Sequence, residues 1–349
     1  MKHPRRIVIL AEAKFSPLTS KTANQAIRYI PEEIVGVIDS TQAGRTAQQV
    51  LGFGGSIPVI ADLRTSLQYK PDTLLIGIAP TGGRLPEQWR SAINEAILNK
   101  LRIISGLHSI LLEDEEFKRK AMEHHAEIID LRKVSPEYEV VSKGLWKNRK
   151  AKTILTIGTD CNAGKMTASL ELHREFVRRG LKSDFVATGQ TGILLSGRGF
   201  AVDSIISDYV AGGIEHEIEL RCSEGAEFIH VEGQGSIAHQ GYSSVTLGLL
   251  HGTMPDAMIM VHHPLRVKDD YGLDLTDVNK FIRLNETVLE PFRVSKVVGI
   301  AVNTAMMTRS QVNLAIHDLE KQTGLPAADV LTPEVSKLVD ALIGYLTSI

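Results

Sequence analysis

The residues with the clearest chemical meaning form a glycine-rich segment, Gly158-Thr-Asp-Cys-Asn-Ala-Gly-Lys-Met-Thr167. An apolar run, Thr153–Ile157, comes directly before it, and a helical pattern follows at Lys165–Arg179. Small and turn-forming residues let the backbone curl until successive N–H groups point at one anion. The N-terminus of the following helix adds a partial positive charge, and the lysine adds a full one. The segment therefore predicts a phosphate-binding loop, or P-loop, that holds a nucleotide or a nucleotide-like cofactor.

This P-loop departs from the strict pattern G-x-x-x-x-G-K-[ST] in two ways. Five residues separate Gly158 from Gly164, and Met166 stands where Ser or Thr normally binds Mg²⁺. Thr167, one residue later, is our candidate for that hydroxyl. Cys161 could be a nucleophile near a helix N-terminus, but we interpret it as a variable position of the loop. The expected cofactor contacts in the loop are Gly158, Thr159, Asp160, Asn162, Ala163, Gly164, Lys165, Met166 and Thr167.

A second signature, Phe228-Ile-His-Val-Glu-Gly-Gln-Gly-Ser236, is an apolar strand that ends in Glu232. In P-loop proteins, a carboxylate at the tip of the strand beside the loop anchors Mg²⁺, directly or through water. A strand-end acid by itself often caps a helix instead. Because the P-loop is also present, we predict a Mg²⁺ site at Thr167 and Glu232.

Further candidates follow predicted strands, at the sheet edge where open α/β sheets bind ligands. In Thr188-Gly-Gln-Thr-Gly192, Gln190 offers a donor and an acceptor for catalysis and Thr191 a substrate contact; the alternative is a plain turn. Asp203 and Asp208 flank four residues of a predicted helix. Asp203 would cap that helix, and Asp208 would serve a metal ion or act as a general base.

His262-His263-Pro-Leu-Arg266 follows another predicted strand. His262 would take the proton of an attacking amine near neutral pH. Arg266 would clamp a substrate carboxylate with two parallel hydrogen bonds. The alternative is a histidine-rich surface loop. Asn303 also ends a predicted strand, where it would hydrogen-bond a nucleobase of the cofactor or cap the next helix.

The elements that must position these residues alternate between β-branched runs and amphipathic stretches, as in parallel α/β proteins. The first half predicts strands at Arg6–Leu10, Ile34–Asp39, Pro58–Ala61, Thr73–Ile78, Ile103–Gly106 and Ile128–Leu131. The second half predicts strands at Thr153–Ile157, Asp184–Ala187, Phe228–Val231, Ala257–Val261 and Val297–Val302. We predict two three-layer α/β domains with parallel sheets, Rossmann-like over residues 1–140 and P-loop NTPase-like over residues 141–349.

Within the first half, the clearest helical pattern is Leu85–Lys100, whose apolar side chains share one face. The polar, basic segment Ser135–Lys152 is interpreted as a solvated linker. Asp39 ends the second strand, where Rossmann domains place a ribose-binding acid, but the first turn, residues 11–17, contains no glycine. We therefore expect no dinucleotide site, and Thr81–Gly83 is the better candidate for a ligand contact.

Composition limits the partners of this 349-residue chain. A net charge of -2 gives no case for nucleic acid, and no apolar run approaches the ~20 residues of a membrane span. Two cysteines supply no disulfide framework, and no ligand pair at helical spacing supports zinc. We expect a cytoplasmic homo-oligomer with a small-molecule substrate. Five histidines nonetheless lie close together in the sequence, at His230, His239, His251, His262 and His263.

The motifs G-T-D-C-x-x-G-K-x-T and V-E-G-x-G resemble those of the P-loop branch that contains dethiobiotin synthetase and the cobyrinic-acid amide synthases. That branch carries G-T-D-T-x-x-G-K-T and V-E-G-A-G. The resemblance covers the core of the second half and implies a Mg²⁺-nucleotide site with Glu232 beside the metal. Met166 replaces Thr, and Thr188–Thr191 replaces a Lys-Pro element of dethiobiotin synthetase, so that enzyme's substrate does not transfer.

A longer series, ATGQTGI, AVDSIISDYVAGG, HVEGQGS, VTLGLLHG and MPDAMIMVHHPLR, resembles a family long described as of unknown function. Its members pair an N-terminal Rossmann-like domain with a C-terminal P-loop domain. The family has also been described as D-glutamate N-acetyltransferase-like. The resemblance implies acetyl-CoA as the donor and a small D-amino acid as the acceptor.

Three functions follow from these observations. N-acetyl transfer would use His262 or Asp208 as the base, with loop N–H groups or Gln190 stabilising the thioester oxygen as it becomes anionic. A Mg²⁺-dependent synthetase would use ATP or GTP, held by the loop and Glu232, to activate a substrate carboxylate. A nucleotide-gated regulator or metallochaperone is the third. The residues alone favour the synthetase, but the resemblance spans both halves, so acetyl transfer is our main prediction.

Overall fold

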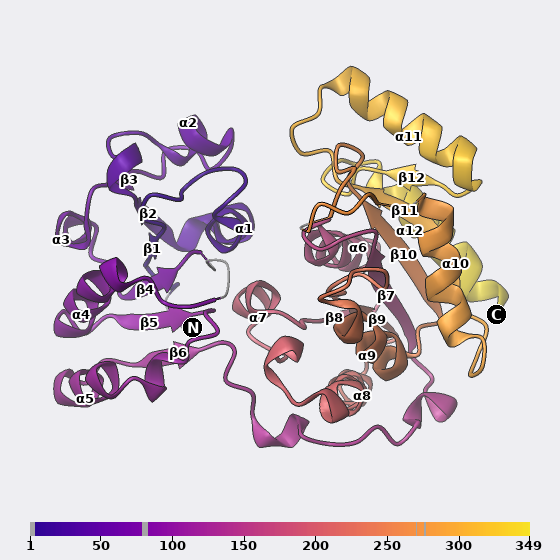
Figure 1. Cartoon of the computed structure of the whole chain (residues 1–349), viewed down its shortest axis with the longest axis horizontal. Coiled ribbons are helices and arrows are strands. Elements are labelled where there is room, and N and C mark those ends of the chain that lie inside the picture. Colours follow the sequence, from indigo (N-terminus) through magenta and orange to yellow (C-terminus); the bar gives the residue numbers. More distant parts are fainter. Residues whose placement is uncertain (1–3, 79–82, 270, 276) are drawn as a thin grey trace. The chain divides into compact units, whose positions relative to one another are not determined.

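The chain folds around two parallel sheets of six strands each. The computed structural model describes residues 4–78, 83–269, 271–275 and 277–349. The chain divides into two compact units, Met1–Val134 with Ile193–Gly197, and Ser135–Gly192 with Arg198–Ile349. Figure 1 shows that each unit has helices lying beside its own sheet. The predicted fold class is confirmed.

The first sheet has the strand order β3-β2-β1-β4-β5-β6, the doubly wound order of Rossmann domains. Its strands are β1 (Ile7–Leu10), β2 (Ile34–Ile38), β3 (Val59–Ile60), β4 (Thr73–Ile76), β5 (Arg102–Ser105) and β6 (Ile128–Asp130). Its helices are α1 (Lys21–Tyr29), α2 (Ala47–Leu51), α3 (Leu63–Ser66), α4 (Arg90–Leu98) and α5 (Glu115–His124). Every residue of β1 and β4 is buried, because helices cover both faces of such a sheet.

The side chain of Asp39 stabilises the first turn of this unit through hydrogen bonds. Its carboxylate accepts the N–H groups of Phe15 and Thr41, each at 2.9 Å, and the side chain is fully buried. These hydrogen bonds give the acid at the end of β2 a structural role that does not require it to bind the ribose of a dinucleotide. Of the predicted ligand contact Thr81–Gly83, the first two residues lie outside the described part of the chain.

The second sheet has the order β12-β11-β10-β7-β9-β8. Its strands are β7 (Lys152–Gly158), β8 (Ser183–Val186), β9 (Phe228–Val231), β10 (Ala257–His262), β11 (Lys296–Val302) and β12 (Ala327–Ala328). Its helices are α6 (Lys165–Arg178), α8 (Ser207–Ser223), α9 (Ser243–Thr253), α10 (Val278–Leu289), α11 (Arg309–Thr323) and α12 (Val335–Ser348). The residues of α7 (Gln190–Ser196) are divided between the two units. Since β7 lies between β10 and β9, the P-loop and Glu232 follow neighbouring strands.

The predicted helix that contained both Asp203 and Asp208 is wrong. A short 3-10 turn, Val202–Ser204, is followed by extended Ile205 and Ile206, and α8 begins at Ser207. Two adjacent β-branched residues favour this extended break. Ile206, not Asp203, precedes the first turn of α8, so Asp203 is not its cap.

The basic connection before β7 is largely exposed, as the sequence suggested, but it also bonds to α8. Glu215 on α8 accepts the N–H groups of Lys143 and Leu145 at 2.6 and 2.7 Å. Arg149, whose side chain is 3% exposed, pairs with Glu219 of α8 at 2.8 Å. The connection is therefore fastened along α8, through acids located some 70 residues later in the sequence.

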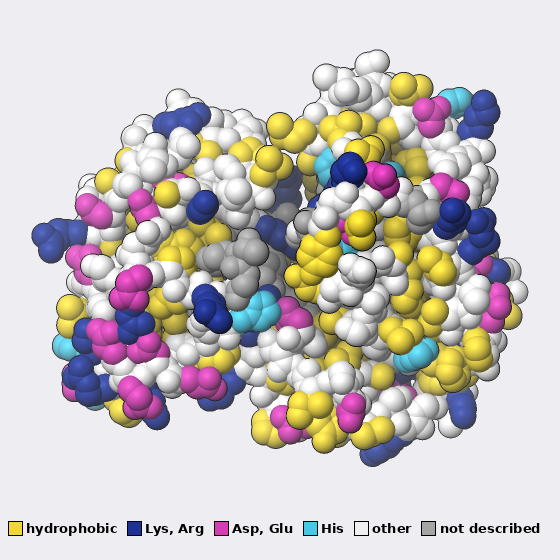
Figure 2. All heavy atoms as spheres, viewed as in Figure 1, with side chains coloured by type: hydrophobic (Ala, Val, Ile, Leu, Met, Phe, Trp, Pro, Cys, Tyr) yellow, Lys and Arg dark blue, Asp and Glu magenta, His cyan; other side chains and the backbone are white. Residues whose placement is uncertain are grey.

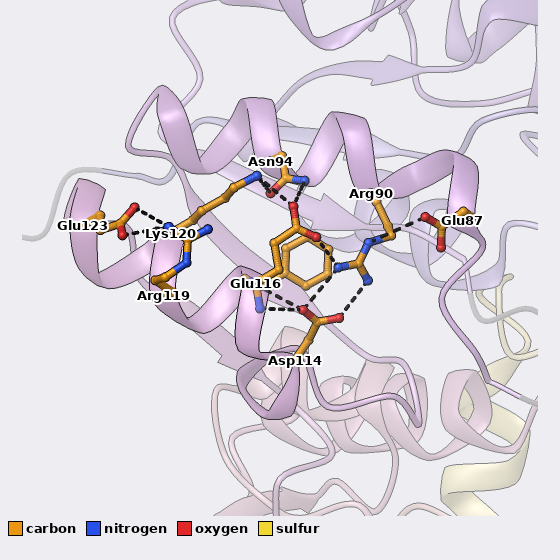
Figure 3. Close-up of polar contacts among 9 residues, drawn as sticks. Glu87, Arg90, Asn94, Asp114, Glu116, Arg119, Lys120 and Glu123 are labelled. Carbon is orange, nitrogen blue, oxygen red and sulfur yellow. Dashed lines mark hydrogen bonds and ion pairs between the residues drawn. The ribbon is translucent and has the colours of Figure 1, made fainter.

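Arg90 joins the start of α4 to the start of α5 (Figure 3). Its guanidinium lies 2.7 Å from Asp114 and 2.5 Å from Glu116, and it covers the ring of Phe117. Lys120 donates to the other oxygen of Glu116 at 2.8 Å. Hydrogen bonds from Lys120, and then from Arg90, lower the pKa of Glu116 to about 2. Figure 2 shows acidic and basic side chains similarly intermingled over the first unit.

This network predicts an acid-dependent loss of stability. In the unfolded chain Glu116 takes up a proton at about pH 4.3, whereas in the folded chain it does so only at about pH 2. The free energy of unfolding therefore decreases as the pH falls from about 4.3 to about 2. Glu116→Gln should lower the unfolding midpoint at pH 7 and approach the wild type as the pH falls. Glu123→Gln, at an exposed pair with Arg119 on the same helix, is the control. Denaturant titrations from pH 7 to 3 measure this, and a constant difference between Glu116→Gln and wild type would contradict it.

Candidate functional site

The carboxyl ends of β7, β10 and β11 meet at one edge of the second sheet. Thr159 N–H donates to Val261 O at 3.1 Å, so the P-loop begins as an extension of the sheet. On the other side of β10, Asn303 N–H donates to His262 O at 2.8 Å. The register of the strands thus brings the loop, His262 and Asn303 together, as parallel strands require.

Left-handed backbone at two positions gives the P-loop its shape. Asn162 has a φ of 54° and Gly164 a φ of 112°. Glycine adopts this region readily, and asparagine more readily than most residues. The chain therefore turns back onto the start of α6 at Lys165, an arrangement that suits an anion at the helix N-terminus.

Lys165 lies folded within the loop. It is 6% exposed, and its ammonium group donates to Asp160 O at 2.8 Å. A Cβ on Gly158 would lie 3.0 Å from Nζ, and a Cβ on Gly233 would lie 3.1 Å from Cδ. The absence of side chains at these two glycines therefore leaves space for the lysine. Its positive charge is positioned beside the loop, where an anionic ligand would bind.

Arg266 reaches the loop from the segment after β10. Its Nε lies 2.6 Å from Asp160 Oδ2, and its Nη1 donates to Cys161 O at 3.1 Å. Asp160 is 1% exposed, and a buried carboxylate needs such a cation. Arg266 therefore pairs with a carboxylate of the chain itself, and its contact with a substrate stays a prediction.

His262 supports the loop through its ring. Its Nδ1 lies 3.0 Å from Thr159 Oγ1. Burial, and then the neighbouring His263, lowers the pKa of His262 to about 4, so the ring is neutral at pH 7. A general base needs the tautomer in which Nδ1–H donates to Thr159 and Nε2 carries the lone pair.

Asn303 supports the loop from the other neighbouring strand. Its amide donates to Ala163 O at 2.9 Å, and its oxygen accepts Ala305 N–H at 3.1 Å. The alternative that Asn303 caps the next helix is wrong, because Thr308 caps α11. Its contact with a nucleobase stays a prediction.

Glu232 is buried at the end of β9, with 3% exposure. Its Oε2 accepts Thr188 N–H and its Oε1 accepts the Gln234 amide, both at 3.0 Å. A Cβ on Gly192 would lie 2.3 Å from Oε2, so glycine is needed where α7 passes the carboxylate. Each carboxylate oxygen has two lone pairs, so these hydrogen bonds do not prevent a contact with Mg²⁺, directly or through a metal-bound water.

The remaining predicted residues occupy three helices. Thr167 is half-buried in the first turn of α6, whereas Met166 before it is buried. Gln190 and Thr191 open α7, and Thr191 is buried. Asp208 is exposed in the first turn of α8, and within the described residues its side chain bonds only to Ser207. The structure therefore gives Asp208 no hydrogen bond to the loop.

His239 was noted in the sequence only as one of several histidines, yet it borders the P-loop. Its buried ring contacts those of Tyr242 and Tyr271, with centroids 4.9 and 5.0 Å apart. Gly241 N–H donates to Nδ1 at 3.1 Å, so the hydrogen of the neutral ring is on Nε2. That nitrogen lies 4.0 Å from Asp160 Oδ1. Only the fold, which returns the loop after β9 to the P-loop, reveals this proximity.

Asp160, Cys161 and His239 offer three potential metal-binding atoms within 4.8 Å of one another. Neither ring nitrogen of His239 has a free lone pair, because Nδ1 accepts Gly241 N–H and Nε2 carries the hydrogen. The charge of Asp160 is already balanced by Arg266. The cluster is therefore a poor site for a metal ion.

The Rossmann strand order in one unit and a P-loop after a central strand in the other define a two-domain P-loop protein. Residues 40–134 match the family described as "Domain of unknown function (DUF1611_N) Rossmann-like domain". Residues 140–339 match "Domain of unknown function (DUF1611_C) P-loop domain". The chain belongs to the DUF1611 family, which confirms the predicted pairing of domains.

Two relatives carry the name D-glutamate N-acetyltransferase. The one from Tritonibacter scottomollicae is 36% identical over 274 residues, which cover 77% of this chain and 80% of the relative. The one from a Pseudoalteromonas species is 36% identical over 273 residues, or 76% and 80% of the two chains. The crystal structure of a DUF1611 family protein from Anabaena variabilis has a TM-score of 0.92 at 34% identity and covers 97% of this chain and 99% of that one. Across the described residues, no helix combines the length and apolar character needed to cross a membrane.

Proposed function

We propose that this protein is an N-acetyltransferase that uses acetyl-CoA and the amino group of D-glutamate or a similar D-amino acid. The observation that carries the proposal is the 36% identity, over 77% of the chain, to a protein named D-glutamate N-acetyltransferase. The P-loop supports it, since a site with Lys165 held ready suits an anionic cofactor.

In this reaction, the deprotonated amine attacks the thioester carbonyl. The C–N bond forms, the C–S bond breaks, and CoA leaves as a thiolate that takes up a proton. The carbonyl oxygen becomes anionic on the way, and fixed N–H donors stabilise it. Loop N–H groups and Gln190 are the proposed donors, and His262 is the proposed base.

The position of His262 restricts how acetyl-CoA can bind. A base must lie within about 3 Å of the proton that it accepts. If His262 is the base, the acetyl group comes to the end of β10, beside Thr159. If the loop instead holds the pyrophosphate, the long pantetheine arm carries the thioester away, and His262 only supports the loop. We propose the first arrangement.

Substitution of His262 separates these two arrangements. Asparagine can keep the bond to Thr159 but removes Nε2, so His262→Asn should lower kcat roughly a hundredfold with little change in KM. Thr159→Val keeps the ring but removes the bond that favours the required tautomer, so we expect it to lower kcat less than His262→Asn does. Steady-state kinetics with D-glutamate measure this. A kcat within a few-fold of the wild type would assign His262 to loop support alone.

The proposal itself is tested first by ligand-induced thermal shifts. A ligand that binds only the folded state raises Tm. We expect acetyl-CoA to raise Tm without Mg²⁺, and free thiol to appear when D-glutamate is added. L-Glutamate is the control for the acceptor.

A Mg²⁺-dependent synthetase is the second candidate, because Glu232 follows the strand next to the P-loop strand. ATP or GTP would be held by Lys165 and Mg²⁺ by Thr167, with Glu232 acting directly or through water. A shift that requires Mg²⁺ and ATP or GTP, without any shift by acetyl-CoA, would favour this function and overturn acetyl transfer.

A further inference from the structure

Cys161 lies in the middle of the P-loop, four residues before α6 begins, and its side chain is half-buried. The start of a helix favours a thiolate over a thiol. Neither the proposed acetyl transfer nor the synthetase alternative uses this side chain. Its surroundings therefore need a separate explanation.

The charged groups around Cys161 come from three parts of the second unit. Arg266, after β10, donates to the carbonyl of Cys161 itself at 3.1 Å. Lys165, at the start of α6, donates to the carbonyl of Asp160 at 2.8 Å. Asp160, the acid among these described residues, is paired with Arg266 at 2.6 Å. Arg266, Lys165 and Asp160 together carry a net positive charge beside the backbone of Cys161.

His239, in the loop after β9, supplies an additional observation. Its side chain is 1% exposed, and within the described residues Nε2 has no hydrogen-bond partner. Because Gly241 fixes the hydrogen on Nε2, this atom is a buried donor without an acceptor. One ring nitrogen of His239 lies within 4.8 Å of Cys161 Sγ, and Nε2 itself lies 4.0 Å from Asp160 Oδ1, in the residue before Cys161. A thiolate at Cys161 would supply a negative charge for this donor.

The second cysteine has the opposite environment. Cys222 lies on α8, where burial and then Glu219 raise its pKa. Both cysteines are partly accessible, so they differ in their electrostatic environment more than in exposure. Cys222 therefore serves as an internal reference for the reactivity of Cys161.

We propose that Cys161 is a reactive thiol whose oxidation by peroxide closes the P-loop to its anionic ligand. The thiolate sulfur attacks one peroxide oxygen, the S–O bond forms, the O–O bond breaks, and hydroxide leaves. Sulfur is oxidised to sulfenic acid and peroxide is reduced, and a reducing thiol reverses the change. The added oxygen stands among the loop groups that would bind the ligand. This inference rests on the proposed function only in that the P-loop is the ligand site. It does not depend on the acetyl-transfer reaction.

The first test compares the labelling rates of the two cysteines by N-ethylmaleimide at pH 7, measured by peptide mass spectrometry. We expect Cys161 to react at least tenfold faster than Cys222. His239→Phe, which keeps an aromatic ring and removes the donor, should slow Cys161 severalfold and leave Cys222 unchanged. Equal rates for the two cysteines in the wild-type protein would overturn the proposal, whether or not this variant folds.

The second test treats the protein with hydrogen peroxide and measures the thermal shift by acetyl-CoA. The shift should disappear in the wild type and in Cys222→Ser, and dithiothreitol should restore it. In Cys161→Ser, treated and untreated samples should agree. A full shift after Cys161 has been oxidised would overturn the proposed block. If acetyl-CoA gives no shift before treatment, the proposed function fails, and Mg²⁺-ATP replaces acetyl-CoA in this test.

Discussion

Lys165→Ala should lower the affinity for acetyl-CoA, or for Mg²⁺-ATP, by at least about a hundredfold, because each proposed chemistry needs this charge beside the ligand. Lys165 is the cation at the start of α6, and its ammonium group lies against the loop backbone at Asp160 O. A hydrogen bond from a charged group to an anion contributes more than a neutral one, and helix N–H groups alone provide only partial charges. Calorimetric titration of both ligands into the variant measures the loss.

Lys182→Ala is the matched control for this substitution. Lys182 lies on the surface with its side chain 71% exposed, and it pairs with Glu227 at 2.9 Å. Its removal changes the net charge equally without touching the loop, and exposed pairs contribute little to stability. We expect wild-type affinity. If Lys165→Ala bound both ligands as tightly as this control, the P-loop would not be the ligand site.

Most of the fold could be predicted because each long strand is recognisable from its own local sequence. Buried parallel strands read as short apolar runs, as in Ile7–Leu10 and Ala257–His262. The two-residue strand Ala327–Ala328 escaped prediction, since alanine has no β preference and the pairing with β11 is not local. The bonds that fasten the connection before β7 were not predicted either, because the acids that bind it lie on α8, some 70 residues later.

The candidate site was predictable in its backbone but not in its side-chain pairs. The spacing of Gly158, Gly164 and Lys165 is a local signal for a P-loop. The ion pair of Arg266 with Asp160 joins residues more than 100 positions apart, and only the packing of β10 against β7 brings them together. An arginine at a sheet edge looks the same in sequence whether it binds a substrate or the chain itself. The sequence likewise does not indicate that His239 lies beside the P-loop.

Gly233→Ala should destabilise the protein by roughly 3 kcal/mol, because the new methyl group has no space. A Cβ at this position would lie 1.7 Å from the carbonyl oxygen of Thr156, which is strand backbone and cannot turn away as a side chain could. The close approach exists because Gly233 N–H donates to Thr156 Oγ1 at 3.0 Å. The methyl group would also lie 3.1 Å from Cδ of Lys165, so ligand affinity should fall together with stability.

Gly344→Ala provides the opposite case within the same unit. Gly344 is exposed in α12, and a Cβ there would meet no atom within 4 Å. Alanine in a helix interior is favoured over glycine by about 0.5–1 kcal/mol, so this variant should be slightly more stable than the wild type. Denaturant unfolding of both variants measures the two changes. If Gly233→Ala matched the wild type in stability and in ligand affinity, the contact between the end of β9 and the P-loop strand would not position Lys165. The P-loop would then depend on its other contacts, which include those of Arg266, His262 and Asn303.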